Sequence, residues 1–150
     1  MSDLKAQLRD DLTAAMKARD ELTTATLRMT LTAISTEEVA GTQARELSDD
    51  EVLKVLTREA KKRREAAEAF EAAGRAELAA RELAEGVVLA RYLPAPLTDE
   101  ELSDMVRAAI AEAGATSPKQ LGQVMKLVQP QVAGRADGRR VSDEVRRQLG

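Results

Sequence analysis

The sequence predicts an all-α protein, with an N-terminal four-helix unit built on a long helical hairpin and a three-helix C-terminal subdomain. Three observations support this prediction. The chain of 150 residues is rich in Ala, Leu, Glu and Arg, which all favour helix. Apolar residues recur at spacings of three to four, the period of one helix face. Capping residues, glycines and prolines divide the chain into seven such segments.

The first two helices are expected at about residues 3–18 and 21–40. Ser2 or Asp3 can cap the first helix, and Gly41 can end the second. The second helix is rich in threonine, a poor helix former, but it shows no period-two alternation, so a strand is not favoured. The expected inward stripes are Leu4, Leu8 and Leu12 in the first helix and Leu27, Leu31 and Ile34 in the second.

The hairpin is expected over residues 51–94. Ser48 and Glu51 form a capping box, in which the serine hydroxyl accepts from a free amide and the glutamate reaches back. Gly74 can adopt the left-handed conformation that closes the first arm. Pro94 lacks an amide hydrogen and disfavours helix in the residue before it, so it stops the second arm. The expected inward stripes are Val52, Leu56, Ala60, Ala67 and Phe70 in the first arm and Leu83, Val87, Ala90 and Leu93 in the second.

A stiff connector, Pro94–Leu97, follows the hairpin because two of its four residues are proline. It marks the expected boundary between an N-terminal unit at residues 1–97 and a C-terminal subdomain at residues 98–150. Directly after it, Thr98–Glu101 forms a second capping box, which opens a helix that ends at Gly114.

Two more helices complete the C-terminal subdomain. Ser117 starts the first of them, with Pro118 at its first helical position. Pro130 is expected to kink or end this helix. Asp137 and Gly138 form either a turn or the cap of the last helix. The expected inward residues are Leu121, Val124 or Met125, and Val128 in the first helix and Val141, Val145 and Leu149 in the second.

A basic run interrupts the apolar stripe of the first hairpin arm. Arg63 lies where the spacing from Ala60 and Ala67 requires an apolar residue. One interpretation is an ion pair with Glu82 or Glu85 of the second arm. The other is a basic ridge that binds phosphates, and its further residues are Lys61, Lys62 and Arg64. We favour the ion pair, because a run of charges on a helix is usually a solvated face.

The composition excludes several kinds of chemistry. The chain has no histidine or cysteine, so zinc, iron–sulfur and haem ligation, histidine base catalysis and cysteine nucleophiles are not expected. There is no GxxxxGK[ST] phosphate loop. Glu82 and Glu85 lie one turn apart, but such pairs are common on helix surfaces, so no metal site is predicted. We expect no catalytic residues and no cofactor.

The cytoplasm is the expected location. No apolar run approaches the roughly 20 residues that span a bilayer. The charged, amphipathic N-terminus does not resemble a secretory signal.

The charge is distributed unevenly along the chain. Residues 1–97 carry a net charge of −3 and residues 98–114 a net charge of −4. Residues 115–150 have seven basic and three acidic residues, a net charge of +4. This last part therefore predicts contacts with phosphates. The predicted nucleic-acid-binding residues are Lys119, Lys126, Arg135, Arg139, Arg140 and Arg146, with Lys61, Lys62 and Arg64 as a secondary basic ridge.

The segment Gly134–Arg140 is the most suggestive part of this region. Its two glycines allow close backbone approach, and Arg135, Arg139 and Arg140 bring positive charge. If Asp137 caps the last helix, the backbone amides at the start of that helix are also available to bind an anion. The alternative is a turn between two helices with solvated arginines.

Several short segments, spread over the whole chain, are informative only as an ordered set. They are Lys61-Lys62-Arg63 leading to Phe70, Ala73-Gly74-Arg75, Glu77-Leu78-Ala79, Glu82 and Glu85, Tyr92-Leu93-Pro94, Glu101-Leu102, Gly122, Met125-Lys126, and Gly134-Arg135-Ala136-Asp137-Gly138 followed by Val141. With this set the chain resembles the GatB/YqeY family, and in particular its free-standing YqeY type.

The resemblance implies a small, all-helical cytoplasmic protein. A similar module forms the tail of the B subunit of the tRNA-dependent amidotransferase, where it contacts tRNA while the chemistry takes place elsewhere. By family, the chain is thus associated with carbon–nitrogen ligation that uses glutamine as amido donor, without a catalytic site of its own. The implied partners are tRNA or other RNA and either an amidotransferase or an aminoacyl-tRNA synthetase. Binding to a membrane is not expected.

The alternative function is a helical protein–protein adaptor that binds no nucleic acid. A net charge of −3 weighs against strong general RNA binding. So does the aromatic content, since Phe70 and Tyr92 are the only aromatic residues and base stacking usually uses aromatics. We expect Tyr92 to be a packing residue with a tethered hydroxyl rather than a stacking platform.

Overall fold

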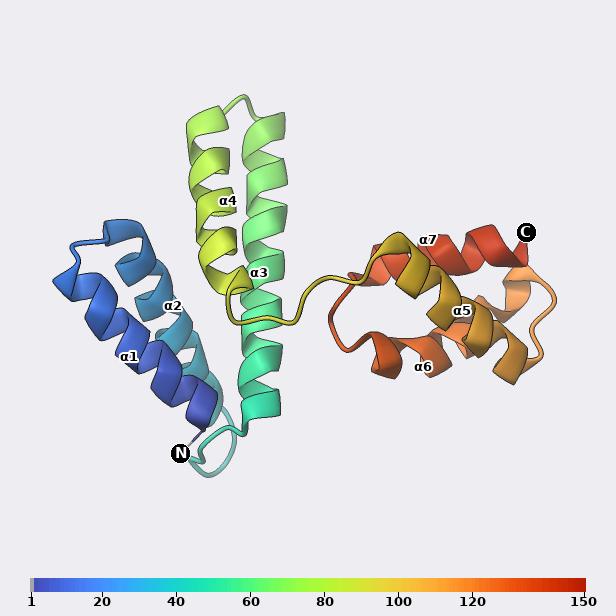
Figure 1. Cartoon of the computed structure of the whole chain (residues 1–150), viewed down its shortest axis with the longest axis horizontal. Helices are drawn as coiled ribbons and strands as arrows, with labels where there is room; N and C mark the ends of the chain where they lie inside the picture. The colour runs from blue at the N-terminus through green and yellow to red at the C-terminus, as the bar shows by residue number, and fades with distance from the viewer. Residues whose placement is uncertain (1) are drawn as a thin grey trace. The chain divides into compact units, whose positions relative to one another are not determined.

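A computed structural model describes residues 2–150, and these residues form seven α-helices and one 3₁₀ turn, with no strand (Figure 1). The prediction of an all-α fold is confirmed. The helices are α1 (Asp3–Lys17), α2 (Glu21–Glu38), α3 (Asp49–Ala72), α4 (Ala76–Ala90), α5 (Asp99–Ala113), α6 (Leu121–Val132) and α7 (Gly138–Leu149), with the 3₁₀ turn at Pro118–Gln120. The chain divides into two compact units, Met1–Leu93 and Pro94–Gly150.

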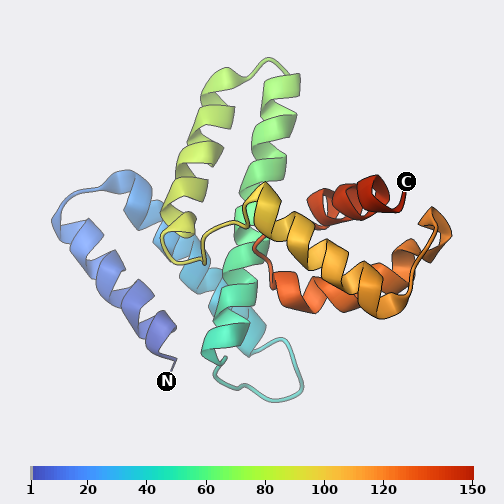
Figure 2. The same cartoon turned by 45° about the vertical axis from the view of Figure 1, so that its right-hand side comes forward.

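The first unit is built on the hairpin of α3 and α4, which run side by side in both views (Figures 1 and 2). Helices α1 and α2 pack against each other, and both contact α3. The core is aliphatic and draws on all four helices. Its largest fully buried side chains are Leu8, Leu27, Ile34, Leu56 and Leu89. Burying each such leucine stabilises the unit by about 1.5–3 kcal/mol.

The start and the tip of the hairpin follow the local signals. Ser48 and Glu51 form the complete capping box at the start of α3. Gly74 has a φ of +73°, the left-handed conformation that ends this arm. Helix α4 ends at Ala90, and the amide of Leu93 donates to the carbonyl of Ala90, a short-range bond that tightens the last turn. The arm thus ends four residues before Pro94.

The expected inward stripe of α4 was wrong for three of its four residues. Leu83 and Val87 are 54% and 62% exposed, and Ala90 is also exposed. The side chains that α4 buries are instead Ala79, Glu85, Val88 and Leu89. The physical reason is that α4 contacts both α2 and α3, so its inward face includes the position of Glu85, a charged residue with an ion-pair partner on α3.

The second unit is a three-helix bundle in which α5, α6 and α7 all contact one another. Thr98 and Glu101 form its first capping box, and Gly114 ends α5 at a φ of +64°. The side chain of Leu97 is 2% exposed in this core. Thus Leu97, which the sequence assigns to the first unit, packs in the second. The core residues of this unit that are 0% exposed are Val106, Ala109, Val124, Val128, Val132, Val141 and Val145.

Proline does not end α6, contrary to one of the two expected outcomes. The helix continues through Pro130 to Val132, and Ala133 then takes a left-handed φ of +50°. A proline loses the backbone bond that its own nitrogen would donate, and its ring crowds the carbonyl four residues earlier, but the residues after it keep their own amides, and here two more helical residues follow.

Candidate nucleic-acid interface

Arg63 is a buried cation rather than a surface ligand. Its side chain is 8% exposed, and its Nε lies 3.3 Å from Oε2 of Glu85, whose side chain is 9% exposed. This confirms the predicted ion pair across the hairpin. The contact is at ion-pair distance, although Nε is not aligned for a hydrogen bond. A second carboxylate, that of Glu59, lies 3.9 Å from Nη1.

The buried pair extends into a network of alternating charges across α2, α3 and α4. Arg81 Nε donates to Glu85 Oε1 at 3.3 Å, and its two terminal nitrogens each donate to Glu21 at 3.0 Å. The hydrogen bonds from Arg81 hold the pKa of Glu21 below its ordinary value. Arg81 is not among the residues predicted to bind or to pair. The sequence signal for its ion pair is the spacing of four between Arg81 and Glu85 on one helix.

The secondary basic ridge lies exposed on α3, next to carboxylates of the same helix. Lys62 Nζ is 3.1 Å from Glu59, and Lys61 Nζ is 3.9 Å from Glu65. Arg64 is exposed on the same helix. These contacts agree with a solvated face, and a role in binding phosphates stays a prediction.

In the second unit, two of the predicted arginines hold the connector and the start of α5. Arg135 Nε donates to the carbonyl of Ala95 at 2.8 Å, and its guanidinium lies 3.7 Å from Glu101. Arg140 donates to Asp99 at 2.8 Å. Both side chains are only half-exposed, so their first role is structural.

Three of the predicted cations are exposed and make no ion pair with residues 2–150: Lys119, Lys126 and Arg139. Lys119, in the 3₁₀ turn, and Lys126, on α6, are seven residues apart, which places them on about the same side. Between them is Gly122, where an added Cβ would meet no atom within 4 Å. This side of α6 is therefore open to a ligand.

Arg139 lies near the other end of this surface. A Cβ added to Gly138 would lie 3.7 Å from the amide nitrogen of Gln129, so α7 begins beside the last turn of α6. Lys126 is one turn before Gln129. Arg146, on α7, lies 3.4 Å from Asp143 and so shares its charge with a carboxylate.

Asp137 is the cap of α7, which decides between the two predicted roles. Its Oδ1 accepts from the amide of Arg140 at 2.8 Å. One of the free amides at this helix start is therefore already bonded.

A cavity of about 410 Å³ lies in the second unit between α5 and α7. It mixes both signs of charge. Its lining residues are Asp99, Leu102, Ser103, Arg140, Asp143, Glu144 and Arg147. Arg147 donates to Glu144, and this bond is the main reason why the pKa of Glu144 falls to about 2. The charged groups of the cavity are thus largely paired with each other.

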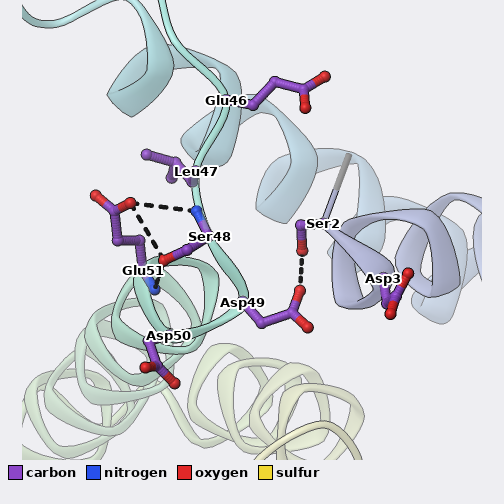
Figure 3. A pocket seen from close by; sticks show the side chains of 8 residues that line it. All are labelled: Ser2, Asp3, Glu46, Leu47, Ser48, Asp49, Asp50 and Glu51. Carbon is purple, nitrogen blue, oxygen red and sulfur yellow. Dashed lines mark hydrogen bonds between the residues drawn. The ribbon is translucent and has the colours of Figure 1, made fainter.

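A cavity of about 610 Å³ in the first unit is lined mainly by acidic side chains (Figure 3). The close-up shows what they do: Ser2 donates to Asp49, and Glu51 closes the capping box with Ser48. Arg45 also donates to Glu51, which lowers the pKa of this carboxyl to about 2. These side chains join the starts of two helices. Within residues 2–150, no group of three or more acidic side chains is placed to hold a metal ion.

Tyr92 is a packing residue, as predicted. It is half-buried, and its hydroxyl donates to Asp11 at 2.6 Å. Burial, together with this bond, raises the pKa of the phenol well above its ordinary value.

The described part of the chain contains no helix that is both long and apolar enough to cross a membrane.

These observations define a class of protein: a chain of two small helical units, without histidine or cysteine, whose second unit carries three exposed cations, Lys119, Lys126 and Arg139, that make no ion pair with residues 2–150. More specifically, the chain belongs to the YqeY-like family, whose model matches residues 5–149. The match confirms the predicted family. No curated protein matches the chain.

Proposed function

We propose that the protein is a tRNA- or RNA-binding accessory module without a catalytic site, and that its phosphate contacts come from the second unit. One observation carries this proposal: Lys119, Lys126 and Arg139 are exposed and make no ion pair with residues 2–150, within a segment of net charge +4. The resemblance to the tRNA-contacting tail of the amidotransferase B subunit supports the choice of RNA.

The unpaired cations are the first contacts for an energetic reason. A cation that neutralises a phosphate releases counterions, and this release drives non-specific binding. An arginine that already contacts a carboxylate must share its charge or give up that pair, which is worth up to about 1 kcal/mol at the surface. We therefore assign Lys119, Lys126 and Arg139 to the main contacts and place Arg135, Arg140 and Arg146 at the margin. Lys61, Lys62 and Arg64 would contribute less.

The proposed setting is the cytoplasm, with an amidotransferase or an aminoacyl-tRNA synthetase as the protein partner. Glutamine-dependent carbon–nitrogen ligation would then take place on that partner. The absence of histidine and cysteine supports this division, because no serine of the chain has a histidine to activate it.

The test is a titration of labelled tRNA at several salt concentrations. The triple variant Lys119→Gln/Lys126→Gln/Arg139→Gln removes three charges and keeps most of each side chain. We expect wild-type affinity to be about micromolar at best near physiological salt, and to fall with salt by a slope of about −0.7 to −0.9 per contact. The triple variant should bind more weakly. Its slope of log K against log salt concentration should be less negative by about two to three, and its helix content should be unchanged.

The matched control is Lys61→Gln/Lys62→Gln/Arg64→Gln, which removes the same charge from the first unit. Its effect should be smaller. No saturable binding by wild type even at low salt would refute RNA binding and favour the protein–protein adaptor. A loss of affinity in the control alone would move the site to α3.

A further inference from the structure

Helix α4 carries an apolar stripe that its own unit leaves exposed. The stripe consists of Ala76, Ala80, Leu83, Val87 and Ala90, all exposed. The side chains of Leu83 and Val87 are 54% and 62% exposed, whereas Val88 and Leu89 on the same helix are 1% and 0% exposed. The spacings of four, three, four and three are those of a seam between two helices, and they extend over about 21 Å.

This stripe differs from ordinary scattered exposure. Single apolar side chains at a surface need no explanation, and Met16, Met29 and Val39 are of that kind. Five consecutive seam positions without one polar residue form a continuous surface, which is typical of a docking site.

We propose that this surface binds a second copy of the chain, with the two α4 helices antiparallel about a two-fold axis at Ala84. The first argument is size. In such a pair, Leu83 of one copy lies within one residue of the level of the partner's Ala84, and Val87 lies within one residue of the level of the partner's Ala80. Large side chains thus pack over small ones in every layer near the axis.

The second argument is charge. Glu77 and Arg91 lie seven residues before and seven residues after Ala84, so all three share one edge of the stripe. Both charged residues are exposed, and neither makes an ion pair with residues 2–150. The antiparallel pair brings Glu77 of each copy to Arg91 of the other. A parallel pair would instead set like charges together, and so the charges select the antiparallel arrangement.

The stripe also sets the strength of association. A stable interface buries about 800 Å² on each partner, and a stripe from one helix of 15 residues offers less. We therefore expect a reversible dimer with a dissociation constant on the order of tens of micromolar.

A charge-swap experiment on the full chain tests the arrangement by sedimentation equilibrium at low salt. Glu77→Arg and Arg91→Glu should each weaken the dimer about five- to tenfold, because each single variant breaks two symmetric pairs. The double variant Glu77→Arg/Arg91→Glu restores both pairs and should recover wild-type association. Asp10→Arg, which changes an exposed charge on α1, is the control and should have no effect.

A crosslinking experiment tests the position of the axis. The chain has no cysteine, so Ala84→Cys introduces the only thiol. A short bismaleimide should then give a covalent dimer, and Ala14→Cys, on the exposed face of α1, should not. A chain that stays monomeric at all concentrations would overturn the proposal, because the stripe would then be covered within one chain or bind another partner. The proposal would also be overturned if neither Glu77→Arg nor Arg91→Glu changed the dissociation constant of the dimer, or if Ala14→Cys gave as much covalent dimer as Ala84→Cys.

Discussion

Replacing Glu85 by leucine tests the energetic role of the buried ion pair of Arg63. The substitution leaves a guanidinium whose side chain is 8% exposed, with the carboxylate of Glu59 at 3.9 Å as its nearest charge. Removing one partner of a buried pair costs about 3–5 kcal/mol. Because Glu59 remains, we expect the free energy of unfolding to fall by about 3 kcal/mol, a large part of the 5–15 kcal/mol typical of a domain.

The assay is urea denaturation followed by tyrosine fluorescence. The chain has one tyrosine and no tryptophan, and Tyr92 belongs to the first unit. The signal therefore reports on the unit that contains Arg63 and Glu85. Unfolding also breaks the bond from Tyr92 to Asp11, which changes the environment of the phenol.

Two variants complete this experiment. Arg63→Met/Glu85→Leu removes both charges, and its stability should lie within about 1 kcal/mol of wild type or above it. Glu68→Leu, at an exposed position of α3, should change stability by at most about 0.5 kcal/mol. The reasoning would be refuted by a loss below about 1 kcal/mol for Glu85→Leu, or by a double variant that is no more stable than the single one.

Two further predictions concern the second unit. Ala133→Gly should raise the stability of this unit by about 0.5–1 kcal/mol in denaturant titrations, because glycine adopts the observed φ of +50° without strain. Ala108→Gly, at an exposed position in the interior of α5, should instead lower the stability by about 1 kcal/mol. A gain from both variants would contradict this. The pKa of Glu144 is lowered from 4.5 to about 2, so its contribution to stability is complete above pH 4.5 and is lost as the pH falls towards 2. An NMR titration of this carboxyl should show the low midpoint, and Arg147→Gln should move it back towards 4.5; an unchanged midpoint would contradict the role of Arg147.

The elements and their ends could largely be predicted from the sequence, because the interactions that set them are local. Ser48, Thr98 and Asp137 cap helices through bonds to residues three positions away. Gly74 and Gly114 end helices through their own backbone conformation. Such signals need no knowledge of the tertiary structure.

The orientation of α4 could not be predicted in the same way. This helix is apolar on more than one side, so its pattern allows more than one inward face. The choice is made by Glu85, which meets Arg63 only after the hairpin has closed. If every charged residue is taken to face solvent, the wrong side of α4 is therefore predicted to face the core, because Glu85 is buried.

The same limit applies to the predicted cations. Arg135 and Arg140 have the same charge in sequence as Arg139, but Ala95 and Asp99 bond them from about forty residues earlier in the chain. Only the three-dimensional arrangement separates the three arginines into two that hold the fold and one that is exposed without a pair.

The hydrogen bonds between Arg135 and the connector determine when the connector can become ordered during synthesis of the chain. A ribosome makes the chain from its N-terminus, so the first unit has all of its residues before Pro94 is added. The amide of Leu97 donates to the carbonyl of Arg135, and the side chain of Arg135 donates to Ala95. While residues 98–134 are being added, the proline-rich connector has neither of these partners. It is fixed in place only once residue 135 has left the ribosome, after the first unit has been free to fold.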